Sequence, residues 1–400
     1  GKDALTANTT GTRNVAVGAT ALDANTTAND NIAIGYAALG VNTTGHSNTS
    51  IGVYSLDANT TANDNTAVGK YSLSSNTTGA SNTAIGGSAL ATNTTASNNT
   101  ALGYYALVAN TTGTERTAVG VASSYGSDTE SDNTVSVGYR AMYMNDATSA
   151  DATDSVAIGH SAMLADASTS ASLISNTAVG TDAIRIAANT TGAVSYNAAV
   201  GTQAMRFNAN TTGTVQYNAA LGYEALEIDA NTTGSVTNNV AVGHQALKSA
   251  SNTTGNVQYN VAVGSKALDI CIASSNTAVG NDALGACTTG ATNVAVGLNA
   301  GVDLTTGDNN TCLGPSAGND LTEGDQNVFV GYNVKPGGAT ESYQIVISTD
   351  QDSGKGASTA FIAPNGGSVY QDNNSADWAT TSDERIKKNI EDNTTGLDVL

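Results

Sequence analysis

The sequence predicts an all-β solenoid, in which short coils of the chain stack on one another. The first observation is a recurring glycine, which we call the landmark glycine. Its step is 17 residues up to Gly120, 18 to Gly138, 21 up to Gly264, and then 16 or 17. The landmark glycines are Gly1, Gly18, Gly35, Gly52, Gly69, Gly86, Gly103, Gly120, Gly138, Gly159, Gly180, Gly201, Gly222, Gly243, Gly264, Gly280, Gly297, Gly314 and Gly331. The second is the motif Asn-Thr-Ala-Val-Gly at 65–69, which recurs with little change. A fixed period of this length is typical of solenoids, whose repeats bury their apolar faces against each other.

Composition supports a thin, stacked core. Charged residues make up 12% and aromatic residues 5% of the 400 residues, so the core must consist of small or β-branched side chains. The 14 basic and 34 acidic residues give a net charge of -20, which disfavours nucleic acid and anionic membranes as partners. We find no run of about 18 apolar residues and expect no membrane insertion in this sequence.

The spacing divides the chain into a shaft over residues 1–331 and two C-terminal parts. A turn at Pro336-Gly337-Gly338 and an alternating segment at 343–348 predict a small β knob over 332–381. The character then becomes helical over 382–400. Within the shaft we expect 17-residue coils over 1–120, an irregular segment over 121–158, 21-residue coils over 159–264, and 16- to 17-residue coils over 265–331.

Each coil is expected to begin with a short strand before the glycine. Counting from the landmark glycine, position -1 is always Val, Ile or Leu from Val17 onward, and position -2 is nearly always Ala or Ser. This alternation is typical of a strand, and we expect the -1 column to point inward. Ala or Ser at position +3 and Leu at position +4 predict a second inward edge. The expected core column contains Val17, Ile34, Ile51, Val68, Ile85 and Leu102.

Two columns of Asn predict hydrogen-bonded ladders. Side chains stacked about 4.8 Å apart can bond to their copies in the coils above and below. Each Asn-Thr-Thr is also a glycosylation sequon, so the second column offers an alternative as glycan acceptors. Because Cys271 and Leu304 share its phase, that position is expected to face inward, which favours the ladder. The columns comprise Asn14, Asn31, Asn48, Asn65, Asn82 and Asn99 at position -4, and Asn25, Asn42, Asn59 and Asn76 at position +7.

The 21-residue coils are expected to enlarge one corner, and loops on one face of a solenoid often bind ligands. Tyr196, Tyr217 and Tyr259 share one phase there, five residues before their glycines. Their rings could stack on sugars. The alternative, which we favour, is that each Tyr covers its own corner.

Two cysteines share a phase in neighbouring coils. This spacing places Cys271 and Cys287 within reach of a disulfide. We favour free buried thiols, since three cysteines do not form a secreted disulfide framework. His46, His160 and His244 lie far apart, and no spacing is typical of a metal site, a cofactor site or a turnover enzyme.

The last 19 residues resemble the opening of the intramolecular chaperone domain of endosialidase-type phage tail spikes and fibres. Its hallmark is Ser-Asp-x-Arg-Leu-Lys-x-x-Ile, matched here by Ser382, Asp383, Arg385, Ile386, Lys387 and Ile390, with Ile for Leu. The resemblance implies trimerisation and then self-cleavage between Thr381 and Ser382, with Ser382 as nucleophile and Lys387 as base, where the complete domain is present. The alternative is a helix start with Ser382 as its N-cap.

The coils themselves are similar to repeats of phage tail fibres and, more distantly, to the β-roll heads of trimeric autotransporter adhesins. Ser155-Val156-Ala157-Ile158-Gly159 is the adhesin string unchanged. Both resemblances imply a homotrimer. We therefore expect a virion tail-fibre shaft that attaches to the host surface, with cell-surface carbohydrate as a possible partner. The alternative is a trimeric adhesin on a bacterial surface.

Overall fold

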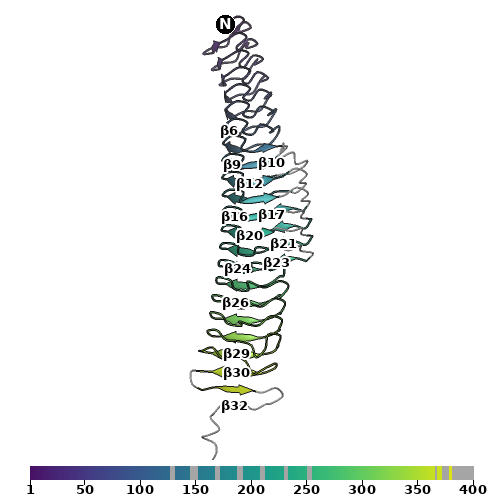
Figure 1. The fold of residues 1–400 in the computed structure, drawn as a ribbon. Helices are drawn as coiled ribbons and strands as arrows, with labels where there is room; N and C mark the ends of the chain where they lie inside the picture. The colour runs from purple at the N-terminus through teal and green to yellow at the C-terminus, as the bar shows by residue number, and fades with distance from the viewer. Residues whose placement is uncertain are drawn as a thin grey trace, which may run out of the picture. The chain divides into compact units, whose positions relative to one another are not determined.

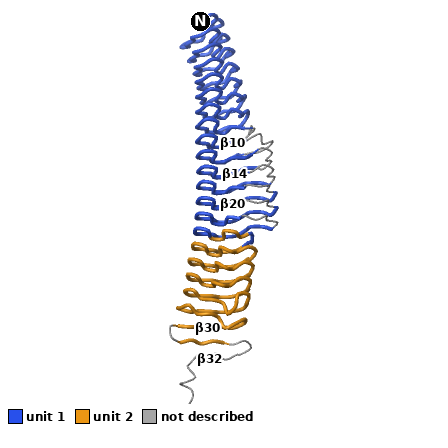
Figure 2. Tube along the Cα trace, in the orientation of Figure 1, with its two compact units in different colours: residues 1–266, 272–274 blue, residues 267–271, 275–400 orange. Residues whose placement is uncertain are grey.

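The computed structural model describes the backbone of residues 1–126, 131–144, 152–166, 172–186, 192–207, 212–228, 233–249, 255–364, 367–371 and 378–380. It confirms the all-β solenoid, and the described residues contain no helix. The chain divides into two units (Figure 2): unit 1 comprises 1–266 and 272–274, and unit 2 comprises 267–271 and 275–400. Residues 382–400, expected to begin as a helix, lie outside the described residues.

A long parallel sheet runs through unit 1, with one short strand from each coil (Figure 1). Equivalent positions pair between coils: Val17 lies opposite Ile34, and Ile34 opposite Ile51. Within 121–158, expected to be irregular, the described strands keep this register, because β9 (Val135–Val137) pairs with both β7 (Thr117–Val119) and β11 (Val156–Ile158). The strands are β1 Val15–Val17, β2 Ile32–Ile34, β3 Thr49–Ile51, β4 Thr66–Val68, β5 Thr83–Ile85, β6 Thr100–Leu102, β7 Thr117–Val119, β9 Val135–Val137, β11 Val156–Ile158, β13 Thr177–Val179, β16 Ala198–Val200, β19 Ala219–Leu221, β22 Val240–Val242 and β24 Val261–Val263.

The landmark glycine is required by the contact between coils. Gly18 has a φ of +137°, in the region that side chains disfavour, and a Cβ built there would lie 2.3 Å from the carbonyl oxygen of Gly35. The same approach recurs from Gly35 to Gly52. Any side chain would push neighbouring coils apart, which explains why this position sets the period.

The longer coils add strands to the cross-section. A six-stranded parallel sheet comprises β8 Tyr125–Gly126, β10 Met142–Met144, β12 Met163–Ala165, β14 Ile184–Ile186, β17 Met205–Phe207 and β20 Leu226–Ile228. A four-stranded sheet comprises β15 Val194–Ser195, β18 Val215–Gln216, β21 Val236–Thr237 and β23 Val257–Gln258. The extra residues therefore form more than an enlarged corner. Their inward side chains, such as Ile186 and Phe207, are buried.

The core of the short coils lies on the opposite side of the strand from the expected one. Ala33 at position -2 is fully buried, as are Ala38 and Leu39 after the next glycine. The -1 column faces outward: Val17 is 55% exposed and Leu102 is 45% exposed. The expectation that Val17, Ile34, Ile51, Val68, Ile85 and Leu102 form the core is wrong, and of these only Val68 is even half-buried. In unit 1 the inward strand position packs against the Ala and Leu of the turn, which leaves room only for Ala or Ser.

Unit 2 repeats the short-coil pattern and then ends differently. Its strands are β25 Thr277–Val279, β26 Val294–Val296, β27 Thr311–Leu313, β28 Val328–Val330, β29 Ile345–Ser348, β30 Ala360–Ala363, β31 Val369–Gln371 and β32 Trp378–Thr380. The region expected to be a separate knob, 332–381, contributes β29 and β30 to the same parallel stack. Only β31 and β32 reverse direction and pair antiparallel.

Candidate interaction surfaces

The Asn column at position -4 joins each coil to the next. The Asn48 side chain accepts the Asn65 backbone N–H at 3.0 Å through Oδ1 and donates through Nδ2 to the Ala62 carbonyl at 2.9 Å. Asn65 repeats these contacts with Asn82 and Gly79. Each amide thus satisfies backbone groups that the coil geometry buries. The structure places Asn31, Asn48, Asn65, Asn82 and Asn99 in this ladder, fully buried, with Asn14 half-buried at its start.

The Asn column at position +7 is also internal. Asn59 donates to Asn42 Oδ1 at 2.9 Å and to the Ala62 carbonyl at 3.1 Å. Asn25, Asn42, Asn59 and Asn76 are fully buried. A glycan could not be attached to a fully buried amide, so these four sequons are part of the structure and not modification sites.

Two apolar rows form the outer face of the long sheet in unit 1, and we call them the apolar face. They comprise positions -3 and -1 from Val15 to Val263, which are Val, Ile, Leu, Thr or Ala throughout. No position in either row carries a charge. Ile34, Leu102 and Leu221 are among the side chains exposed there. An uncharged face of exposed and half-buried side chains, most of them apolar, is a candidate interaction surface. The -1 row of this face is the column that the sequence analysis expected to lie in the core.

Aromatic rings at positions +1 and +2, directly after the landmark glycine, border the apolar face. They were not identified from the sequence. Tyr54 stacks on Tyr71 with ring centroids 5.5 Å apart, and Tyr139 stacks on His160 at 5.4 Å. Tyr223 stacks on His244 at 5.7 Å. The signal was available, since aromatic residues recur at the first two positions after the glycine. Tyr side chains are enriched at protein interfaces, which fits a border of the apolar face.

The predicted Tyr residues form a column on the other side of the apolar face, at position -5. Tyr196 and Tyr217 lie parallel, with centroids 5.1 Å and ring planes 6° apart. Their exposed fractions are 50% and 55%, and Tyr259 is 62% exposed. These rings stand out from the coil instead of packing down over it. The structure therefore leaves the sugar-stacking alternative open and weakens the covering alternative.

A charged cluster lies on and beside strands β17 and β20 of the longer coils, of which Arg206 and Glu227 are the central residues. Lys248 Nζ lies 2.7 Å from Glu224 Oε2 and 2.9 Å from Glu227 Oε2, and Arg206 lies 3.3 Å from Glu227. Burial raises the pKa of Glu224, but hydrogen bonds from Gln245, Lys248 and Tyr223 outweigh it and lower the pKa to about 2. The paired carboxylates raise the pKa of Lys248 above its usual value. The cluster binds coils together and leaves no group poised for catalysis.

The cysteines are buried free thiols. Cys271 Sγ and Cys287 Sγ lie 3.3 Å apart within unit 2, in the shared phase that the sequence indicated. The contact with Cys271 and burial raise the pKa of Cys287, and burial raises the pKa of Cys312 to about 12. Cys287 and Cys312 therefore stay protonated and unreactive at neutral pH.

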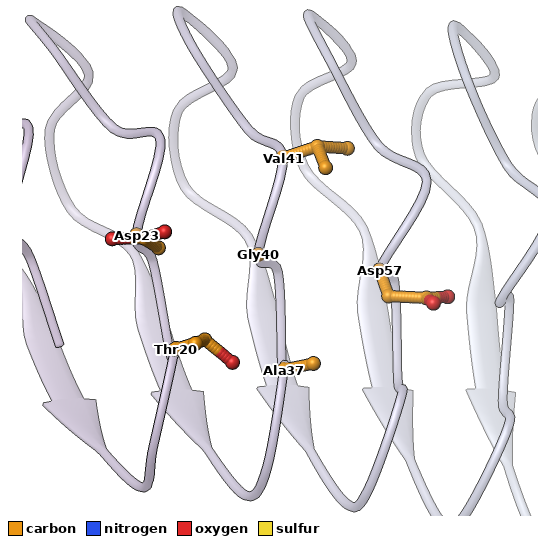
Figure 3. A pocket seen from close by; sticks show the side chains of 6 residues that line it. All are labelled: Thr20, Asp23, Ala37, Gly40, Val41 and Asp57. Atoms are coloured by element: carbon orange, nitrogen blue, oxygen red, sulfur yellow. The ribbon is translucent and has the colours of Figure 1, made fainter. Parts of the chain in front are cut away.

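A shallow pocket opens on the short coils beside Gly40 (Figure 3). It has a volume of about 210 Å³, and its polar lining includes Thr20, Asp23 and Asp57. Asp23 and Asp57 occupy the same phase as Gly40 in the flanking coils, so the pocket exists because Gly40 lacks a side chain. Burial raises the pKa of Asp57. No buried, unsatisfied polar group points into the pocket among the described residues.

No chemistry-bearing site emerges from the described part of the chain. Its His, Cys, Asp and Glu residues form no group of three suited to a metal. It also holds no helix with the length and apolar character needed to cross a bilayer. The self-cleavage residues Ser382 and Lys387 lie outside the described residues. Comparison with protein-family models, curated proteins and solved structures found no match.

Proposed function

We propose that this chain is the shaft of a phage tail fibre, a homotrimer that holds a virion to the surface of its host outside the cell. The observation that carries the proposal is the apolar face of unit 1. An exposed row of Val, Ile and Leu on a chain with a net charge of -20 requires a partner that covers it. A second and a third copy of the same chain supply the same face and bury it around a common axis.

The partner is proposed to be self because the face repeats with the coil. Ile34, Ile51 and Ile85 recur in register with the strands, so an identical chain presents a matching periodic surface. A globular partner has no such repeat. The number three rests on the resemblance to tail-fibre and adhesin repeats.

A trimeric adhesin on a bacterial surface is the second candidate. Ser155-Val156-Ala157-Ile158-Gly159 favours it, since this is the adhesin repeat string unchanged. Both candidates need the same assembled shaft. They differ in what the gene encodes around it: a signal peptide and a membrane anchor select the adhesin, and neighbouring virion genes select the tail fibre.

Assembly is tested by a charge placed on the apolar face. Wild-type chain should sediment as a trimer, and Leu102→Glu should shift it toward monomer, because three carboxylates would be buried near one axis. The matched control is Thr95→Glu, an exposed position of the same coil away from the face, which should remain trimeric. A wild-type monomer, or a Leu102→Glu variant that assembles like the control, would contradict the proposal.

Self-cleavage is proposed as the one covalent reaction of the chain. Ser382 Oγ would attack the carbonyl of Thr381 while Lys387 takes the hydroxyl proton and returns it to the Ser382 nitrogen as the Thr381–Ser382 C–N bond breaks. Water would then hydrolyse the ester between Thr381 and Ser382 Oγ, giving a single turnover without a cofactor. The support is the match from Ser382 to Ile390.

A further inference from the structure

The Tyr column of unit 1 has one missing ring. Residues 196, 217, 238 and 259 occupy position -5 of four consecutive coils, and they are Tyr, Tyr, Asn and Tyr. The backbones are equivalent: their φ values lie between 58° and 60°. Their N–H groups all donate to the preceding coil, as from Tyr217 to Ser195 and from Asn238 to Gln216. Only the side chain at 238 breaks the pattern.

The spacing leaves a slot for a single ring. Tyr196 and Tyr217, one coil apart, stack at 5.1 Å. Tyr217 and Tyr259 are two coils apart, or about 9.6 Å at the usual strand spacing. One ring placed between them would lie about 4.8 Å from each, within the range of stacking contacts. Asn238 lies between the two Tyr positions, is exposed, and makes no side-chain hydrogen bond among the described residues.

The chemistry of the slot favours a sugar ring. The C–H groups of a pyranose contact the electron-rich faces of the Tyr rings. The amide of Asn238 offers both a donor and an acceptor to ring hydroxyls. A nucleobase would bring phosphate toward a chain with a net charge of -20, which opposes binding. An aromatic side chain would stack but leave the Asn238 amide unused.

We propose that Tyr217 and Tyr259 are the walls, and Asn238 the floor, of a subsite that binds one pyranose ring of a glycan. The choice of a glycan rests on the proposed attachment function, whereas the slot rests on the missing ring alone. Position -5 is separated from the apolar face by the buried Asn of position -4. The column therefore lies beside that face, and Tyr217 and Tyr259 are exposed to solvent along it.

The test fills the slot without disturbing the fold. Asn238→Tyr should complete the column, because Tyr is already accommodated at this backbone position in three neighbouring coils. The probes are neutral and N-acetylated oligosaccharides of glucose, galactose and N-acetylglucosamine, followed by saturation-transfer NMR and titration calorimetry on the assembled protein. Wild type should bind at least one of them, and Asn238→Tyr and Tyr259→Ala should each lose at least tenfold in affinity.

The matched control is Ser175→Tyr, which adds a ring to the far end of the same column at φ 56° and should bind as wild type. Unchanged binding by Asn238→Tyr, binding by none of the oligosaccharides, or binding of tyrosinamide alone would each overturn the glycan subsite. If the wild-type protein is a trimer that binds no sugar, the subsite is contradicted and the proposed shaft is supported. If the wild-type protein is a monomer that binds sugar, and Asn238→Tyr does not bind it, the subsite is supported and the proposed shaft is contradicted.

Discussion

Single side chains satisfy the backbone between coils, and Asn65 shows how much depends on one amide. Its Oδ1 accepts the Asn82 N–H at 3.0 Å and its Nδ2 donates to the Gly79 carbonyl at 2.9 Å, both in a fully buried position. Asn65→Ala should leave both groups unpaired and lower the local free energy of unfolding by about 2 kcal/mol or more. Amide exchange of the flanking coils measures this.

The control for that change is Thr61→Ala in the same coil. Thr61 is exposed and makes no side-chain hydrogen bond among the described residues, so its removal should change protection by less than about 0.5 kcal/mol. Equal protection in the two variants would mean that the Asn column does not stabilise the stack.

At the scale of single residues, the sequence could not determine which side of the strand faces inward. Alternation shows that positions -3 and -1 share one side and position -2 the other, but it does not say which side is the core. Hydrophobicity favoured Val17 and Ile34 inside. Volume decided otherwise, because the turn already fills the interior with residues such as Ala21 and Leu22. The stacking itself was predictable, since it follows from the repeated close contact at the landmark glycine.

A larger side chain in the strand can fill the space of a smaller one in the turn of the same core. This explains why position +4, which is usually Leu, differs in unit 2. Position +4 is Gly301 and Gly318 in unit 2, where a Cβ on Gly318 would lie 2.4 Å from Cys312 Sγ. Cys312 and Phe329 occupy the strand position that is Ala or Ser throughout unit 1. The larger strand residue thus takes the space of the missing Leu. Such compensation can be read from a sequence only when it is known which side of the strand is buried.

The charged cluster around Glu224 in the longer coils is predicted to weaken in acid. The pKa of Glu224 is about 2, below the usual value of about 4.3, because Lys248, Gln245 and Tyr223 stabilise its ionised form over the opposing effect of burial. A lowered pKa in the folded state means that the contribution is complete above about pH 4 and is lost as the pH falls toward 2. Amide protection in β20 and around Ser249, corrected for intrinsic exchange, should fall across this window.

Glu224→Gln separates this effect from general acid unfolding. The variant keeps a neutral acceptor near Lys248 but lacks the titrating charge, so its protection should be lower at pH 7 and nearly flat between pH 4 and pH 2. A variant that follows the wild-type curve would assign the acid sensitivity to other carboxylates.

At the scale of the whole molecule, charge and apolar surface are kept apart. The chain carries a net charge of -20, yet positions -3 and -1 carry none in either unit. Association of like-charged chains is opposed by repulsion, which is screened beyond about 10 Å at 0.1 M salt. In the proposed trimer, an uncharged face would keep the charges away from the surfaces in contact. The absence of charge at positions -3 and -1 could be read from the sequence. Only the structure showed that these positions face outward.

Processing of the assembled chain is the last prediction, and it separates assembly from chemistry. In the gene product that carries the complete chaperone domain, mass spectrometry should find a fragment ending at Thr381. Ser382→Ala should leave the chain uncut but still trimeric, because the apolar face is unchanged. Lys387→Met should also block the cut, since it removes the only proposed base, whereas Thr381→Ala keeps nucleophile and base and should still be cut. Cleavage at the same bond in Ser382→Ala would assign the nucleophile to another residue.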